Sequence, residues 1–537
     1  MSGAILTLAR RGTAWARRRL NAERRVVAAE FDRNYYLAVN PDVAVTGADP
    51  LDHFLAHGWR EGRDPNGRFS VVEYLNDNPD VVAAGVNPFA HYLRSGRAEG
   101  RTPAHDMGFR YRILARQIRP QDQLDAAARA TLGVKIGTPA QLSAGLASSR
   151  TGLRDLHITF SHDDYRTNVG GVQLCIQREA AGLVERGHDH LHLCPPVAWP
   201  MLRLAGEEGR LLVLLNGRPL GTFPPAVIAE ALARVPASGG VRSFAVHSLL
   251  GHTADETIAI VRAAGLGAGF FWLHDYASLC AGYNLLRNNV EDCAAPPPNS
   301  AACGICIYGP WRGPQAAAHA TLFAGLDLTV VSPAARTLDF WRASGAPPIS
   351  RAVVHPHATL APRGPAPRPS ADRPLRVAYV GWPVAHKGWP LFQQLALRYA
   401  GDPRYAFHHL GARAEPGLPV SFREVRVTAE QPAAMQAALE AAEIDVLIFW
   451  PLWRETFSFT VYEAIAAGCA VITGPDSGNV AAMVEAQDAG WVLETPDALE
   501  AAFASGEVAK LARARRASML YDMTLSGMTL DLIPAIP

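Results

Sequence analysis

Two glutamates eight positions apart follow a strand-like apolar run in the C-terminal part of the sequence. The run Val446–Phe449 predicts a buried strand, Glu455 lies in the loop after it, and Glu463 lies inside a helix that begins near Ser458. The first backbone amides of such a helix can bind a diphosphate or sugar hydroxyls. Glu455 can then reach a sugar, and Glu463 a ribose diol. In isolation this spacing is usually a solvated pair of carboxylates, but the strand, loop and helix around it favour a nucleotide-sugar site.

A lysine and a pair of glycines follow two further strand-like runs. Lys387 comes after Val377–Val380, where its charge can neutralise a diphosphate that is becoming a leaving group. Gly170 and Gly171 come after Leu156–Phe160 and open a helix. Glycines at a helix start allow a phosphate to approach the backbone closely. A plain strand-to-helix turn is the alternative for this pair.

His274 ends the run Phe270–Leu273 and would face the same cleft as the glycines. A buried structural histidine is the alternative to a residue of the site. His247, at the end of the preceding strand, is a lesser candidate.

Four cysteines follow His274 within an insertion. Their thiolates have the makeup of a tetrahedral zinc site, in which a Cys-x2-Cys pair is completed by two further sulfurs. Such a zinc, or another metal bound by thiolates, would be structural rather than catalytic, and the alternative is a set of buried or adventitiously oxidised thiols. The residues are Cys280, Cys293, Cys303 and Cys306.

The candidate glutamates, lysine, glycines and histidine can act together only if the ends of their strands meet at one cleft. From Asp155 onward strand-like runs alternate with helical stretches, and after a proline-rich stretch a second alternating set starts at Val377. We therefore predict an α/β protein with Rossmann-like domains over 151–360 and 375–537, joined by a hinge over 361–374. Ligands bind such sheets at the carboxyl ends of the strands. Further runs that predict strands are His190–Leu193, Leu211–Leu215, Phe244–Val246, Leu328–Val331, Ala352–Val354, Ala406–Leu410, Val425–Val427, Ala470–Thr473 and Trp491–Leu493.

The N-terminal region contains an internal repeat. Phe31–Pro65 aligns with Phe69–Pro103 and is identical at 16 of 35 positions, which predicts two helical units of period 38 over 31–105. Residues 1–30 hold seven arginines and two glutamates, as a basic amphipathic helix on an anionic membrane would, or a solvated leader. Residues 106–150 are expected to be a linker.

Composition excludes several classes of protein. The 537 residues carry a net charge of +1, which argues against a protein that coats nucleic acid. No apolar run reaches the ~18–20 residues that a membrane span requires. Seven cysteines, an odd number, and the lack of a signal peptide predict a cytoplasmic protein, with contact to the inner face of the membrane through the leader.

The stretch from Asp445 to Thr473 resembles glycosyltransferase family 4, the retaining nucleotide-sugar enzymes of the GT-B fold. It carries the Glu-x7-Glu signature of that family, followed by Ala-x-x-Ala-Gly-Cys-Ala-Val-Ile. The resemblance implies that Glu455 contacts the donor sugar and Glu463 the ribose hydroxyls. The amides of Thr456, Phe457 and Ser458 would lie near the diphosphate.

The resemblance also implies roles for residues outside this stretch. Lys387 would bind the diphosphate, Gly170 and Gly171 would form the glycine loop, and His274 would lie against the donor sugar and assist catalysis. The sequence departs from the family pattern twice. Ser458 occupies a position that is usually glycine, and Trp382 occupies one that is commonly arginine.

The expected activity is transfer of a sugar from a nucleotide-sugar donor to an acceptor hydroxyl with retention of configuration. The setting implied by the resemblance is assembly of cell-surface polysaccharide or glycan, with a glycan or lipid-linked acceptor and no nucleic acid. Catalysis would require no cofactor. The alternative is a catalytically impaired GT-B scaffold or glycan-binding protein, which the two departures motivate.

Overall fold

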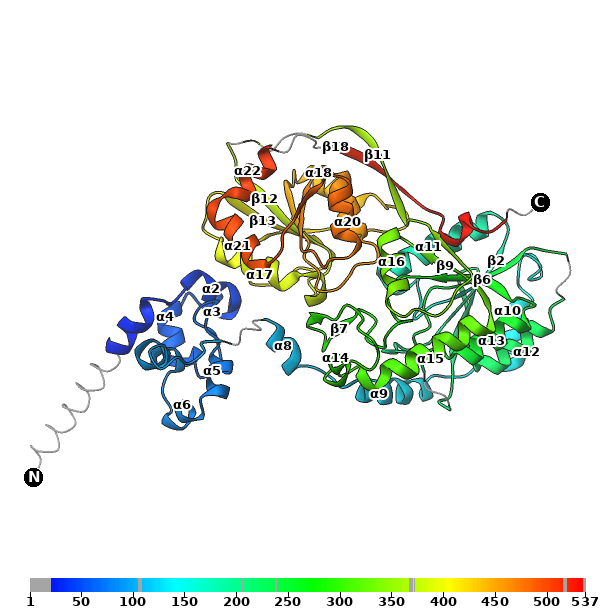
Figure 1. Ribbon diagram of the computed structural model, residues 1–537, viewed down its shortest axis with the longest axis horizontal. Helices are drawn as coiled ribbons and strands as arrows, with labels where there is room; N and C mark the ends of the chain where they lie inside the picture. Colours follow the sequence, from blue (N-terminus) through cyan, green and yellow to red (C-terminus); the bar gives the residue numbers. More distant parts are fainter. Residues whose placement is uncertain are drawn as a thin grey trace, which may run out of the picture.

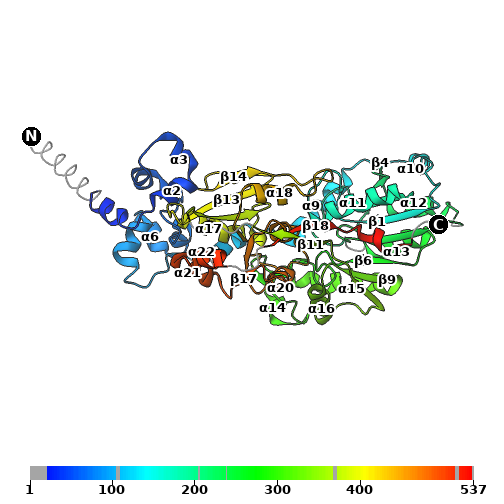
Figure 2. The same cartoon turned by 90° about the horizontal axis from the view of Figure 1, so that it is seen from above.

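The computed structural model describes residues 21–104, 109–203, 206–236, 239–366, 370, 372–514 and 519–534. They form two α/β domains and a small helical region that holds the sequence repeats (Figure 1). In both views the helical region lies at one end of the molecule, beside the second α/β domain (Figure 2).

An eight-stranded sheet forms the core of the first α/β domain, in the order β10-β9-β6-β5-β1-β2-β3-β4. The strands from β10 to β2 are parallel, whereas β3 pairs antiparallel with both β2 and β4, which departs from the expected parallel sheet. The central strands are buried along their whole length because helices cover the sheet. The bounds are β1 (Leu156–Phe160), β2 (Asp189–Cys194), β3 (Leu211–Leu215), β4 (Arg218–Phe223), β5 (Arg242–Val246), β6 (Ala268–Trp272), β9 (Asp327–Ser332) and β10 (Arg351–Val354).

The helices of this domain follow their strands in chain order. The insertion between β6 and β9 adds a small hairpin, β7 (Leu286–Arg287) and β8 (Glu291–Asp292), and a short helix, α14 (Ala301–Gly304). The longer helices of the domain are α11 (Gly171–Glu185), α12 (Pro225–Ala233), α13 (Ala254–Ala263), α15 (Gly309–Gly325) and α16 (Ala335–Ala343).

The second α/β domain holds a six-stranded parallel sheet in the order β14-β13-β12-β15-β16-β17. Apolar side chains of its strands pack against helices on both faces, in two separate clusters. The strands are β12 (Leu375–Val380), β13 (Tyr405–Gly411), β14 (Ser421–Glu424), β15 (Val446–Ile448), β16 (Ala470–Thr473) and β17 (Gly490–Val492). The helices are η3 (Ala385–Lys387), α17 (Trp389–Arg398), α18 (Ala434–Ala441), α19 (Phe459–Ala466), α20 (Asn479–Ala486), α21 (Pro496–Ser505) and α22 (Glu507–Ala514).

The two sequence repeats adopt the same succession of helices. In each unit a buried tyrosine hydroxyl lies 2.9 Å from a histidine Nδ1, between Tyr36 and His53 and between Tyr74 and His91. The units share one apolar core. Their helices are α2 (Arg33–Val39), α3 (Pro41–Thr46), α4 (Pro50–His53) and η1 (Phe54–Gly58), then α5 (Val71–Asp77), α6 (Pro79–Ala84), α7 (Pro88–His91) and η2 (Tyr92–Gly96).

The segment 106–150, expected to be a linker, is helical and packs on the first domain. It forms α8 (Phe109–Ala115), α9 (Pro120–Leu132) and α10 (Pro139–Leu146). Leu124 of α9 and Leu142 of α10 are completely buried, because the first domain covers their apolar faces. Most of this segment therefore belongs to the first domain.

The expected hinge and the C-terminal boundary also differ from the prediction. Residues 358–365 form β11 (Ala358–Pro365), which pairs antiparallel with β18 (Met519–Leu525), so two strands join the domains (Figure 1). The chain after β18 returns to the first domain as η4 (Met528–Asp531), where Leu530 packs on Leu183 of α11. β18 itself packs on the second domain, where Gln436 of α18 donates to the backbone oxygen of Tyr521, whereas the residues after β18 complete the core of the first domain.

The predicted basic leader lies mostly outside the described residues, which begin at residue 21. Within the described part, Arg24 pairs with Asp52 and Val27 is buried in the core of the repeats. Among the described residues no helix is both long and apolar enough to cross a membrane.

Candidate functional site

The candidate site lies where the carboxyl ends of both sheets face each other. The loop between β15 and α19 reaches across to the first domain. There the Thr456 hydroxyl donates to the backbone oxygen of His274 at 2.7 Å, and the Thr337 hydroxyl donates to the backbone oxygen of Thr456 at 3.0 Å. The structure therefore brings the C-terminal loop and His274 together, as the sequence predicted for a cleft between two strand ends.

Glu455 is buried in this loop and is held by two donors. Lys387 Nζ lies 2.5 Å from Glu455 Oε1, and the indole nitrogen of Trp453 donates to the same oxygen at 2.8 Å. Burial raises the pKa of Glu455, although Lys387 and Trp453 oppose that rise. The carboxylate is thus fixed in position, with Oε2 left for a ligand hydroxyl.

Glu463 projects from the second turn of α19. It is 5% exposed, and no hydrogen bond joins its carboxylate to any other described residue. Burial raises the pKa of Glu463 to about 8. A buried carboxylate without a donor is unfavourable unless a ligand supplies one.

The N-terminus of α19 presents backbone amides that have no acceptor within the described part of the chain. They belong to Thr456, Phe457, Ser458, Phe459 and Thr460. Ser458 is the N-cap, its φ of −140° is ordinary for any residue, and its side chain makes no capping bond. Serine is therefore compatible with the backbone here, although the pattern of the family has glycine. Free amides at a helix start form an anion site.

Lys387 is positioned by a turn that only glycine fits. Gly388, the next residue, has φ +88°, and a Cβ there would lie 2.2 Å from the backbone oxygen of Trp450. The Lys387 side chain remains 32% exposed and lies over the Trp453 ring. Its ammonium group can therefore reach an anion at the start of α19 while it holds Glu455.

The position that is commonly arginine in the resembled family holds an exposed tryptophan. Trp382 is 58% exposed, immediately after Gly381. Arg454 does not supply the missing charge, because its guanidinium donates to Asp292 at 2.7 Å and to Asp476 at 2.9 Å. Its bond to Asp292 instead joins the loop before α19 to the insertion of the first domain.

His274 lies in a chain of hydrogen bonds that the sequence did not reveal. His247 Nδ1 is 2.9 Å from His274 Nε2, and His247 Nε2 is 3.2 Å from Oε1 of Glu179. Burial, with the neighbouring rings of His247 and His357, lowers the pKa of His274 well below its ordinary value. The ring is therefore neutral at pH 7. Glu179 has no sequence signal of its own, since it is one carboxylate among the polar residues of α11.

The glycine pair opens α11 beside the start of α19. A Cβ on Gly171 would lie 3.7 Å from the Phe459 ring, so the two helix starts are close together. Gly170 is the N-cap, and the Gln173 side chain folds back over it. Both helix N-termini thus point toward one region, which is favourable for a doubly charged diphosphate.

The four cysteines of the predicted zinc site are not gathered around a common point. Among the described residues no group of three or more His, Cys, Asp or Glu side chains is arranged to hold a metal ion. The Cys303 sulfur instead accepts from Arg312 at 2.9 Å, and Cys280 is buried. This arrangement does not fit zinc, so no role follows from one.

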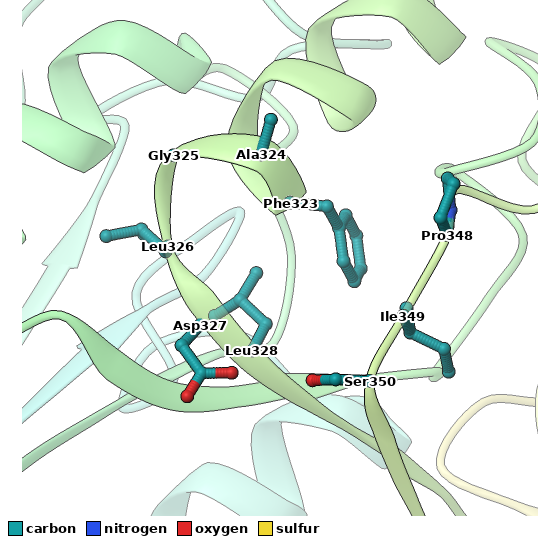
Figure 3. A pocket seen from close by; sticks show the side chains of 9 residues that line it. All are labelled: Phe323, Ala324, Gly325, Leu326, Asp327, Leu328, Pro348, Ile349 and Ser350. Atoms are coloured by element: carbon teal, nitrogen blue, oxygen red, sulfur yellow. The ribbon is translucent and has the colours of Figure 1, made fainter.

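Two cavities of the molecule lie away from these residues. One, of about 520 Å³, is at the amino end of β9 and is lined by Phe323, Asp327 and Ile349 among others (Figure 3). The other, of about 620 Å³, lies between the repeats and α17 of the second domain. Neither is lined by a candidate residue.

One family model matches part of the second domain. Residues 380–508 match the family model described as glycosyl transferases group 1. No curated protein matches the chain.

Several solved structures resemble the chain at low identity. Sucrose-phosphate synthase from Thermosynechococcus elongatus is 13% identical with a TM-score of 0.42, and covers 67% of this chain and 93% of its own. Anabaena HepE in complex with UDP-glucose is 13% identical over 67% and 93%, with a TM-score of 0.36. The lipopolysaccharide outer core galactosyltransferase WaaB is 12% identical over 67% and 94%, with a TM-score of 0.39. The chain therefore carries the pattern of group 1 glycosyl transferases over residues 380–508 of its second domain, and its two α/β domains face each other across the site.

Proposed function

We propose that the protein transfers a sugar from a nucleotide-sugar donor to an acceptor hydroxyl with retention of configuration, in the assembly of cell-surface polysaccharide or glycan. One observation carries the proposal: the free amides at the start of α19 lie on the same helix as the unpartnered carboxylate of Glu463. An anion site and a buried acceptor of hydroxyl hydrogens on one helix fit the diphosphate and ribose of one ligand.

The donor would lie along the second domain. Its ribose hydroxyls donate to Glu463, its diphosphate takes the amides of α19 and the charge of Lys387, and its sugar lies against Glu455. The acceptor approaches from the first domain past His274. Catalysis comes from stabilising the charge that develops on the departing diphosphate, in a site that the two domains close against water.

The stereochemistry tests this proposal directly. The chain is incubated with a panel of UDP-, GDP-, ADP- and CDP-sugars and a glycan acceptor, and the anomeric configuration of the product is read from proton couplings before mutarotation. We expect one donor to be consumed and its configuration to be kept. An inverted product would contradict retention, and no turnover of any donor would favour a glycan-binding scaffold.

Donor affinity is expected to rise with pH through Glu463. Its pKa of about 8 in the free protein means that the carboxyl group is mainly protonated at pH 6.5, whereas two ribose hydroxyls require the ionised acceptor. Binding then releases a proton, and the dissociation constant should fall about tenfold per pH unit below pH 8. Titration calorimetry with an intact nucleotide sugar measures this, because its diphosphate diester does not titrate in the same range.

Glu463→Gln is the matched control, because the amide keeps an acceptor oxygen and cannot titrate. The variant should bind more weakly at pH 8.5 and show little dependence on pH. A wild-type affinity that stays constant from pH 6.5 to pH 8.5 would contradict the assigned contact between Glu463 and the donor.

The polysaccharide setting is supported by the resemblance to family 4 and by the basic composition of the leader. Under this proposal residues 1–30 contact anionic lipid at the inner face of the membrane, and the repeats help to position the acceptor. The donor site does not depend on these roles of the leader and the repeats.

A further inference from the structure

A buried carboxylate on α11 contacts His247 and the C-terminal segment at the same time. Glu179 Oε1 lies 3.2 Å from His247 Nε2, and Oε2 accepts from the Thr529 amide at 2.8 Å. Glu179 and His247 are fully buried or nearly so. The two oxygens therefore have different partners, and neither faces solvent.

The two histidines are joined by a bond in the plane of their rings. The ring centroids of His247 and His274 are 5.1 Å apart, the planes differ by only 18°, and the nitrogen atoms are 2.9 Å apart. Two rings that meet edge to edge have this combination of values, whereas stacked rings would have closer centroids. One proton must therefore lie between His247 Nδ1 and His274 Nε2.

The carboxylate decides which ring supplies that proton. Burial alone would raise the pKa of Glu179, but its interactions with His247 and His157 hold the pKa well below its ordinary value. An ionised Glu179 can only accept, so His247 donates to it from Nε2, and a His247 ring with that one proton offers a lone pair at Nδ1. His274 then donates from Nε2 to His247 and leaves its own Nδ1 unprotonated.

The unprotonated Nδ1 of His274 is the nitrogen that a ligand can reach. His274 is 8% exposed, and its Nδ1 has no hydrogen-bond partner within the part of the chain that the structure describes. A lone pair there accepts a hydrogen bond from a sugar or acceptor hydroxyl, whereas a protonated Nδ1 would repel the hydroxyl hydrogen.

We propose that Glu179 is a positioning residue that sets the tautomer of His274 through His247, so that His274 presents an unprotonated Nδ1 to the substrate. The inference rests on the proposed function for the consequence in catalysis, but the tautomer itself does not depend on it. Other titratable or charged groups around the three residues are His157, His162, His190, His355, His357 and Arg178.

Glu179→Gln should reverse the direction of the proton chain. The Thr529 amide is a donor, so it requires the amide oxygen of glutamine on its side and places the NH2 group against His247. That group donates to His247 Nε2, which moves the proton of His247 to Nδ1 and that of His274 to its own Nδ1. The side chain keeps its shape, so the hydrogen bond to the C-terminal segment is retained.

The measurement is nitrogen NMR of the full chain labelled with 15N-histidine, with His274 assigned from the signal lost in His274→Asn. In the wild type at pH 8 we expect His274 Nδ1 to have the shift of an unprotonated nitrogen. In Glu179→Gln it should take the shift of a protonated one, while kcat falls at least tenfold and the donor KM changes less than threefold. Glu179→Asp, which keeps an acceptor, should retain the wild-type tautomer.

Thr159→Val is the matched control, because it removes a 3.3 Å hydrogen bond to the same carboxylate oxygen and leaves His247 its acceptor. In this variant His274 should have the same tautomer as in the wild type. A protonated His274 Nδ1 in the wild type would overturn the proposal without any variant, and so would an unchanged tautomer in Glu179→Gln. A tautomer that reverses in a protein without transferase activity would instead contradict the proposed function alone.

Discussion

Replacing Lys387 by methionine is expected to lower kcat by about 10³-fold, the effect of removing one fixed charge from a developing anion in a dry site. Lys387 lies beside the free amides of α19 and is partly exposed, so its charge can act on the leaving diphosphate. Arg454 cannot replace it, because Asp292 and Asp476 hold its guanidinium. Single-turnover rates at saturating donor measure the effect.

Stability needs a separate control, because the same change leaves Glu455 buried without its cation. The double variant Lys387→Met with Glu455→Gln is neutral at both positions and keeps an acceptor for Trp453, 2.8 Å away in the wild type. It should recover the melting temperature of the wild type and remain inactive. If Lys387→Met kept kcat within tenfold of the wild type, the charge on the diphosphate would be stabilised by other groups.

Mild acid is expected to unfold the first domain. Burial lowers the pKa of His190 to about 3, and those of His252 and His319 to about 4, whereas histidine in an unfolded chain titrates near 6.5. The unfolded state therefore binds more protons than the folded one below pH 6.5, and stability is lost as the pH falls. At pH 5.5 each of these histidines lowers the free energy of unfolding by about 1.4 kcal/mol, so the three together lower it by about 4 kcal/mol.

Calorimetric scans between pH 7.5 and pH 5 measure this loss as a falling melting temperature of one transition. His319→Gln is a suitable variant, since the His319 ring donates only to the backbone oxygen of Gln315, at 2.9 Å. It should be less stable than the wild type at pH 7.5 and lose less stability on acidification. A transition temperature independent of pH over this range would show that these histidines are already accommodated as cations.

Most strands could be predicted from the sequence because buried strands are continuous apolar runs. Leu211–Leu215 and Ala470–Thr473 coincide with β3 and β16. The sequence predicts a strand at Val425–Val427, but the strand there, β14, is Ser421–Glu424. Its four residues are all exposed and so give no apolar signal. β4 was missed, although Asn216 and Gly217 between β3 and β4 both have positive φ, and Asn-Gly is a strong hairpin signal.

The site was predictable where function depends on local sequence and not where it depends on tertiary contact. Glu455, Lys387 and His274 each follow a strand, and parallel strands place their carboxyl ends together. The bond between Lys387 and Glu455 and the chain from Glu179 to His274 join residues far apart in sequence. The return of the C-terminal segment to the first domain has no signal in composition, because Met528–Asp531 is an ordinary short stretch.

That return also sets the order in which the chain can mature during synthesis. The Thr529 amide caps Glu179 and its hydroxyl accepts from the indole of Trp272, so the first domain lacks two of its buried polar contacts until the end of the chain emerges. At elongation rates of about 5–20 residues per second, the interval between β10 and this segment is roughly 10–35 s. Throughout that time the nascent first domain exposes the apolar surface that Leu530 and Ile533 later cover. The first domain is therefore completed only after the last residues of the chain have been synthesised.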